Sequence, residues 1–108
     1  MKKILVVCSQ NKWRSPTAEA IYRHDPRFAI RSAGLSKHSP HVLSQSDLEW
    51  ADLLLYMEKD HLEKIKEIFS NTKLPKAINL DIPDDYRYMD PELIEILKEK
   101  IETIVYTL

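Results

Sequence analysis

The sequence contains one glycine and one cysteine in 108 residues, and it has no long apolar run. A lone thiol, Cys8, cannot close an internal disulfide, which excludes a small disulfide-stapled secreted domain. A membrane span needs about 18 consecutive apolar residues, which no stretch approaches, and the opening MKKILVVCSQ has no signal-peptide cleavage site. We therefore expect a cytoplasmic protein with no membrane partner.

An excess of charge of either sign is also missing. Lysine and arginine total 16 against 17 aspartates and glutamates, so the formal net charge is −1. Nucleic acids and anionic membrane surfaces attract proteins with a basic excess. The balance excludes a general polyanion binder, and we expect no nucleic-acid partner.

The sequence offers no cluster of metal ligands. Only two of the four histidines, His38 and His41, are close together, and their Ser/Pro-containing loop has no cysteine or grouped carboxylates. A zinc site needs three or four such ligands in one place. We expect no metal, and we interpret all four histidines as surface residues: His24, His38, His41 and His61.

What is present fits a single domain spanning residues 1–108. Hydrophobic residues make up 44% and charged residues 31% of the chain, enough for one modest core. Apolar, β-branched runs predict strands at 4–8, 28–32, 53–57 and 76–80. Apolar spacing and start signals predict helices at 15–24, 44–49, 58–69 and 90–105. This alternation predicts a three-layer α/β/α fold with a four-stranded parallel sheet between the helices.

Particular residues are expected to shape the connections. Gly34 follows the second predicted strand, and we expect it at positive φ, where glycine has no steric penalty. Ser46 and Asp47 are candidate caps for the short helix, and Asp90 is the candidate cap of the last one.

The segment CSQNKWRSP, which joins the first predicted strand to the first helix, has the composition of an anion-binding loop. Ligands of parallel sheets lie at this edge, where loop N–H groups and the helix dipole attract a dianion and favour a thiolate at Cys8. Arg14 offers a planar fork for two phosphate oxygens, and Ser15 can donate to the sulfur. The expected phosphate-binding residues form one run: Ser9, Gln10, Asn11, Lys12, Trp13, Arg14 and Ser15.

This segment resembles the phosphate loop of the low-molecular-weight protein tyrosine phosphatases, whose pattern is Cys-x-Gly-Asn-x-Cys-Arg-Ser-Pro. Three further segments resemble the same family in the same order: RSAGL at 31–35, ADLLLYMEKDH at 51–61 and DIPDDY at 81–86. The resemblance implies a hydrolase that needs no cofactor. Its substrate would be a phosphorylated protein, most simply phosphotyrosine, or a small aryl phosphate.

The resemblance also implies a role for each part of the site. Cys8 would attack phosphorus and form a cysteinyl-phosphate that water hydrolyses, while Arg14 stabilises the equatorial oxygens. Asp84 would protonate the leaving group if the Ile-Pro-Asp register holds. Its competitors are Asp81, at a strand end; Asp85, its neighbour; and Asp90, at a helix start.

The side chains around the entrance leave some alternatives open. Trp13 and Tyr86 would wall a groove for an aromatic substrate, although either could pack on the protein instead, and Tyr88 stays undecided. Lys12 would attract anions and repel a phosphorylated arginine. An acidic segment such as DIPDDYRYMD also commonly faces solvent.

Three positions depart from the family pattern. Gln10 replaces the loop glycine, Trp13 the second cysteine and Asp85 the proline of the acid loop. These changes leave a catalytically weak or inactive phosphate- or phosphopeptide-binding module as the alternative function. An arsenate reductase of the thioredoxin-coupled kind would need further cysteines, which the chain lacks.

Overall fold

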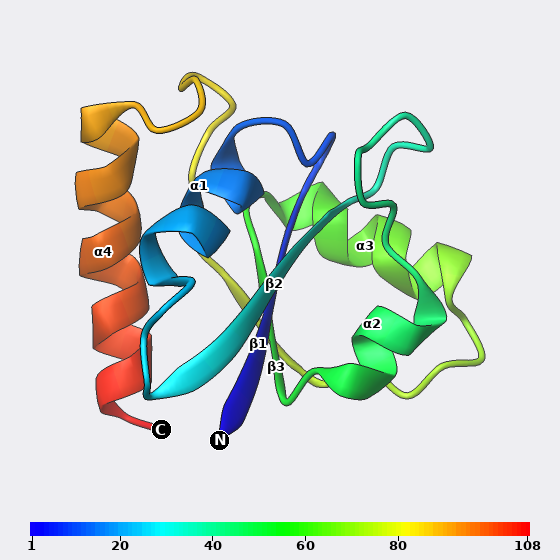
Figure 1. Cartoon of the computed structure of the whole chain (residues 1–108). Helices are drawn as coiled ribbons and strands as arrows, with labels where there is room; N and C mark the ends of the chain where they lie inside the picture. Colours follow the sequence, from blue (N-terminus) through cyan, green and yellow to red (C-terminus); the bar gives the residue numbers. More distant parts are fainter.

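A computed structural model describes every residue from 1 to 108 and contains one parallel sheet flanked by helices (Figure 1). The strands are β1 (Lys2–Cys8), β2 (Phe28–Gly34), β3 (Leu53–Tyr56) and β4 (Lys76–Asn79). The helices are α1 (Arg14–Tyr22), α2 (Gln45–Trp50), α3 (Lys59–Ile68) and α4 (Pro91–Tyr106). The strand order is β2-β1-β3-β4, and every pair is parallel. The predicted fold class is confirmed.

The two faces of the sheet are covered by different helices, α1 and α4 on one face and α2 and α3 on the other (Figure 1). Side chains alternate along a strand, so Ile4 and Val6 of β1 pack toward α1 and α4, whereas Leu5 and Val7 pack toward α2 and α3. Both faces of β1 are therefore buried from Ile4 to Cys8, as the continuous apolar run predicts. None of the helices is long and apolar enough to cross a membrane.

The second strand is longer than predicted and continues to Gly34, which pairs with Cys8 of β1. The expectation of positive φ at Gly34 is wrong, because the residues with positive φ are Asn11, Asp81 and Met89. A glycine is needed at this position because a side chain would collide with the loop that follows β1. A Cβ at this position would lie 2.7 Å from the backbone nitrogen of Asn11 and 2.8 Å from the carbonyl carbon of Gln10.

Helix α2 begins with a reciprocal capping pair. Ser44 is the cap, rather than Ser46 or Asp47 as predicted: its Oγ accepts from the Asp47 backbone at 3.2 Å, and the Asp47 carboxylate accepts from the Ser44 backbone at 3.0 Å. The same carboxylate lies 2.9 Å from His41 Nε2 and is 2% exposed. Burial disfavours the charged form of Asp47, but the hydrogen bonds from His41 and Ser44 outweigh it and lower its pKa below the ordinary 3.8.

This capping pair predicts an acid-sensitive part of the folding stability. A carboxyl whose folded pKa is lowered stabilises the fold above its unfolded pKa, and that contribution is lost as the pH falls through the folded pKa. Asp47→Asn should therefore lower the free energy of unfolding by about 1–3 kcal/mol at pH 7 and have a shrinking effect below about pH 5. Urea unfolding at several pH values measures this, with Glu63→Gln as control, because Glu63 is an exposed carboxylate outside the capping pair. An effect of Asp47→Asn that does not vary with pH would contradict the assignment.

Candidate active site

The loop between β1 and α1 lies at the carboxyl edge of the sheet, at the point where the strand order reverses between β1 and β3. From Ser9 to Trp13, no backbone N–H donates to a backbone carbonyl. Consecutive amides of this kind at a helix start form an anion-binding cradle. The loop therefore has the donors that a phosphate group requires.

The buried side chain of Asn11 holds this loop in place through hydrogen bonds. Asn11 has a φ of 51° and is 5% exposed, and asparagine tolerates this left-handed region better than most residues. Its Nδ2 donates to Ser15 Oγ and to Ser32 Oγ, both at 3.0 Å, and its Oδ1 accepts from the His41 backbone at 3.2 Å. Gln10, which replaces the family glycine, has no positive φ, so its side chain causes no backbone strain there.

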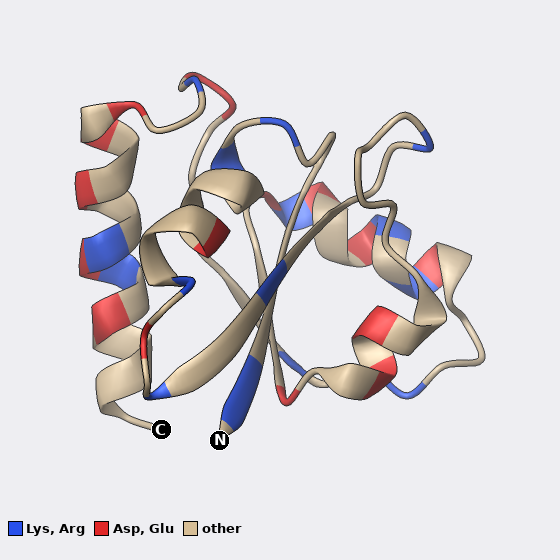
Figure 2. Cartoon of the chain, viewed as in Figure 1, with Lys and Arg blue, Asp and Glu red and all other residues tan.

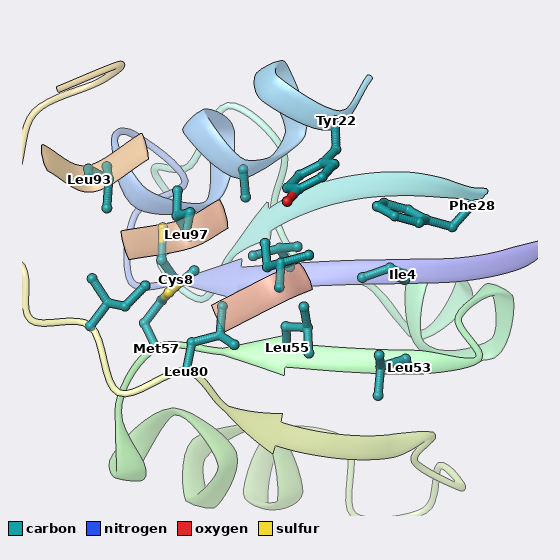
Figure 3. Packing of buried hydrophobic residues seen from close by; sticks show 14 residues of the cluster. Ile4, Cys8, Tyr22, Phe28, Leu53, Leu55, Met57, Leu80, Leu93 and Leu97 are labelled. Carbon is teal, nitrogen blue, oxygen red and sulfur yellow. The ribbon is translucent and has the colours of Figure 1, made fainter. Parts of the chain in front are cut away.

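Cys8 ends β1 beneath the loop and is 2% exposed. Its Sγ lies 3.0 Å from Ser15 Oγ, which is positioned to donate to a thiolate. Figure 3 shows Cys8 at the end of its strand, among the apolar side chains of the cluster that also contains Met57 and Leu97. The thiol thus lies where the core meets the loop.

Arg14 is the largest fully buried side chain, with 1% exposure. Its Nη1 donates to Glu58 Oε2 and to the carbonyl of Ile82, both at 2.8 Å, so both hydrogens of Nη1 are used. Its Nη2 lies 3.4 Å from Ser9 Oγ. Nη1 thus fixes the guanidinium, and the Nε–Nη2 edge, which makes only longer contacts with Asp84 and Ser9, can offer a bidentate contact to phosphate.

Asp84 alone among the four candidate acids contacts the loop arginine, with Oδ1 3.6 Å from Arg14 Nε. Asp90 caps α4 by accepting from the Glu92 backbone at 2.9 Å, as predicted. Asp81 and Asp85 are exposed. In Figure 2 the acidic segment that precedes α4 and the basic residues of the phosphate loop lie at the same edge of the sheet.

One small pocket joins these groups. Most of the predicted site residues line it: Cys8, Ser9, Gln10, Lys12, Trp13, Arg14 and Asp84. The larger groove of about 520 Å³ lies between residues 79–83 and α4 and has no cysteine or arginine in its lining. We place the reactive centre in the small pocket because the nucleophile candidate is there.

Of the two aromatic residues predicted to wall a substrate groove, one lines the pocket and the other does not. Trp13 lines the pocket and is half-buried, with Lys12 Nζ 4.9 Å from its ring centroid. Tyr86 packs against the apolar cluster and is not among the pocket residues. Tyr88 is 52% exposed. A substrate groove formed by Trp13 and Tyr86 stays a prediction.

The sequence analysis missed Glu58 and His61. His61 is not a surface residue as predicted, because it is 1% exposed, and its Nε2 lies 3.0 Å from Ser9 Oγ. Burial and the Arg14 charge lower its pKa. The available signal was positional: both residues follow β3, which neighbours β1, and the carboxyl ends of parallel strands meet at one edge.

A thiol, a buried arginine and a run of unpaired amides around one pocket define an α/β protein of the cysteine-dependent phosphatase class. No family model matches the chain. The low molecular weight protein-tyrosine-phosphatase Wzb of Escherichia coli K12 is 30% identical to it, over 78% of each chain. The chain belongs to the low-molecular-weight protein tyrosine phosphatases, which are hydrolases.

Solved structures of this family have the same architecture. Wzb from Escherichia coli K30, in complex with phosphate, has a TM-score of 0.79 at 26% identity, with 99% of this chain and 98% of that chain covered. Vibrio vulnificus Wzb, in complex with benzylphosphonate, has a TM-score of 0.79 at 25% identity, with 99% of each chain covered. The Geobacillus stearothermophilus arginine phosphatase YwlE shares the fold, with a TM-score of 0.70 at 24% identity over 98% of this chain and 89% of its own. The arsenate reductase alternative gains no support from these relatives.

Proposed function

We propose that this chain hydrolyses phosphotyrosine in proteins, or a related aryl phosphate, through a cysteinyl-phosphate formed on Cys8. The thiolate attacks phosphorus in line with the departing phenolic oxygen, the P–O bond breaks and an S–P bond forms. Water then attacks the same phosphorus, which releases inorganic phosphate and returns the thiolate. The observation that carries this proposal is that the sulfur, the arginine and a carboxylate share one pocket.

Charge stabilisation in this mechanism comes from groups that are already in place. The loop amides and the Nε–Nη2 edge of Arg14 would bind the three equatorial oxygens throughout both steps. Because Glu58 and the Ile82 carbonyl hold the other side of the guanidinium, it needs little reorganisation when charge develops. Ser15 would stabilise the thiolate as nucleophile and then as leaving group.

Asp84 is our candidate for the proton carrier. A phenolate leaves poorly without a proton, so the carboxylic acid would protonate it and the resulting carboxylate would then accept a proton from the attacking water. Its contact with Arg14 Nε is the geometric support, since none of its three competitors reaches the loop.

The substrate class is supported by chemistry at the entrance. The two Wzb relatives are named tyrosine phosphatases, and YwlE is named an arginine phosphatase. Lys12 lines the pocket of this chain, and its ammonium group would repel the guanidinium of a phosphoarginine while attracting a phosphate dianion. Trp13 adds an aromatic surface beside it. We further propose a cytoplasmic location, where the reducing environment keeps Cys8 a free thiol.

Hydrolysis of matched peptides tests this function. The wild type should release phosphate from a phosphotyrosine peptide without added metal, and much more slowly from the phosphoarginine and phosphoserine versions. Asp84→Asn should lower kcat/KM for phenyl phosphate by about 10²–10⁴-fold, because kcat/KM reports the steps up to the transfer of the phosphoryl group to Cys8. The loss should be smaller for para-nitrophenyl phosphate, whose leaving group needs less protonation.

Asp85→Asn is the matched control because it removes the neighbouring carboxylate from the same loop. The Asp85→Asn protein should show the same ratio of activities on phenyl phosphate and para-nitrophenyl phosphate as the wild type. Equal losses of kcat/KM from Asp84→Asn on both aryl phosphates would contradict the role of Asp84 as the acid, and faster hydrolysis of the phosphoarginine peptide would contradict the substrate class.

A further inference from the structure

His61 is held in one tautomer by the start of α3. Its Nδ1 accepts from the backbone N–H groups of Met57 and Glu58, at 3.3 and 3.2 Å. A neutral imidazole that accepts at Nδ1 carries its hydrogen on Nε2. That nitrogen lies 3.0 Å from Ser9 Oγ and 3.4 Å from Glu58 Oε2, so its shorter contact is a donation to Ser9.

Ser9 Oγ therefore accepts two hydrogen bonds from buried groups. The first comes from His61 Nε2 and the second from Arg14 Nη2, at 3.4 Å. A hydroxyl has two lone pairs and one hydrogen, so these contacts occupy the lone pairs and leave the hydrogen to be donated elsewhere. Ser9 lines the small pocket together with Cys8 and Arg14, so that is where an acceptor would lie.

We propose that Ser9 is a further catalytic residue whose hydroxyl donates to the phosphoryl group, and that His61 is the positioning residue that orients it. This inference rests on the proposed function, since it needs a phosphoryl group in the pocket. In the transition state the negative charge is spread over the three equatorial oxygens, and a donor fixed in place stabilises it there. Arg14 also helps to orient the Ser9 hydroxyl, because that hydroxyl accepts a hydrogen bond from Arg14 Nη2.

The geometry excludes the more familiar role for a serine beside a histidine. A histidine that activates a serine nucleophile accepts the hydroxyl hydrogen at its unprotonated nitrogen. Here the unprotonated nitrogen, Nδ1, faces the backbone of Met57 and Glu58, and the nitrogen that faces Ser9 carries a hydrogen. His61 therefore orients Ser9 and does not deprotonate it, and Cys8 stays the nucleophile.

Three variants in the full chain test the proposal with para-nitrophenyl phosphate as substrate. Ser9→Ala should lower kcat by about 10–100-fold with a smaller change in KM, because a neutral donor to a charged group is removed. Ser9→Thr keeps the hydroxyl and should restore most of the activity. His61→Asn keeps a short acceptor for the backbone N–H groups of Met57 and Glu58 but is too short to reach Ser9. It should lower kcat only in a protein that still has Ser9.

The double variant Ser9→Ala/His61→Asn isolates the positioning role. If His61 acts through Ser9, the double variant is no slower than Ser9→Ala alone. The exposed His24→Asn is the control and should leave kcat unchanged. A Ser9→Ala kcat within twofold of the wild type overturns the catalytic role, and losses that multiply in the double variant overturn the positioning role.

Imidazole nitrogen chemical shifts provide a second measurement that does not depend on how the His61 variant folds. In the wild type at pH 8 His61 should be the neutral tautomer with hydrogen on Nε2, and a hydrogen on Nδ1 overturns the proposal. Failure of the proposed function would look different, because the wild-type turnover itself would then be absent or unaffected by Cys8→Ser.

Discussion

Cys8→Ser should abolish phosphatase turnover while the phosphate loop keeps its structure and its affinity for phosphate. A serine hydroxyl is nearly isosteric with the thiol but is not ionised at neutral pH, and the hydrogen-bond partner at this position is the neutral hydroxyl of Ser15. We expect a fall in kcat on the order of 10³-fold or more. Initial rates with para-nitrophenyl phosphate and calorimetric titration with inorganic phosphate measure the two properties separately.

This result separates an enzyme from a binding module. Binding of an anion requires the loop amides and Arg14, but it requires no thiol. If the wild type binds phosphate but shows no turnover that depends on Cys8, the chain is the phosphate- or phosphopeptide-binding module that the departures at Gln10, Trp13 and Asp85 left open. Cys8→Ala is the companion variant, and it should match Cys8→Ser in activity.

Gly34→Ala should lower the phosphatase activity, although Gly34 is not part of the phosphate loop. The added methyl would meet two backbone atoms of the phosphate loop at 2.7 and 2.8 Å, so the Gln10–Asn11 peptide would have to move. The buried hydrogen bonds of the Asn11 side chain hold this backbone, so its displacement would cost free energy. We expect a fall in kcat on the order of 10²-fold from a displacement of about 1 Å, and a lower midpoint of thermal unfolding.

Ser39 provides the control for this prediction, because its Oγ would lie even nearer to the new methyl. Ser39→Ala alone should be neutral or stabilising, since the buried Oγ has no hydrogen-bond partner. In the double variant Gly34→Ala/Ser39→Ala, the loss of the Ser39 hydroxyl removes the clash with that side chain, whereas the clash with the backbone of Gln10 and Asn11 remains. Full recovery of kcat in Gly34→Ala/Ser39→Ala would contradict the account of Gly34 as the spacer of the phosphate loop.

The core of the fold follows from patterns that the sequence displays locally. The continuous apolar runs of β1 and β3 require cover on both faces, and the four helices supply it. The nucleophile, the arginine and the helix start occur within nine residues, 8–16, so one loop carries most of the chemistry. These features were predictable because each depends on neighbours in the chain.

The remaining features depend on residues that are distant in the chain. His61 looks like an exposed helical histidine, because its burial is created by β1 and the loop that follows it. Gly34 suggests a turn, whereas it is needed for the approach of a loop 23 residues earlier. The left-handed residue is Asn11 rather than the neighbouring position where the family has glycine, because Ser15, Ser32 and the His41 backbone bind its side chain.

The most direct test of the account is to trap the intermediate. The Asp84→Ala protein, mixed with para-nitrophenyl phosphate and quenched within milliseconds, should carry one phosphoryl group per chain, located on Cys8 by peptide mass spectrometry. The good leaving group allows the first step, and the loss of the carboxylate slows attack by water, so the intermediate accumulates. Turnover without any phosphorylated Cys8, or a phosphoryl group on Ser9 in its place, would contradict a cysteinyl-phosphate mechanism.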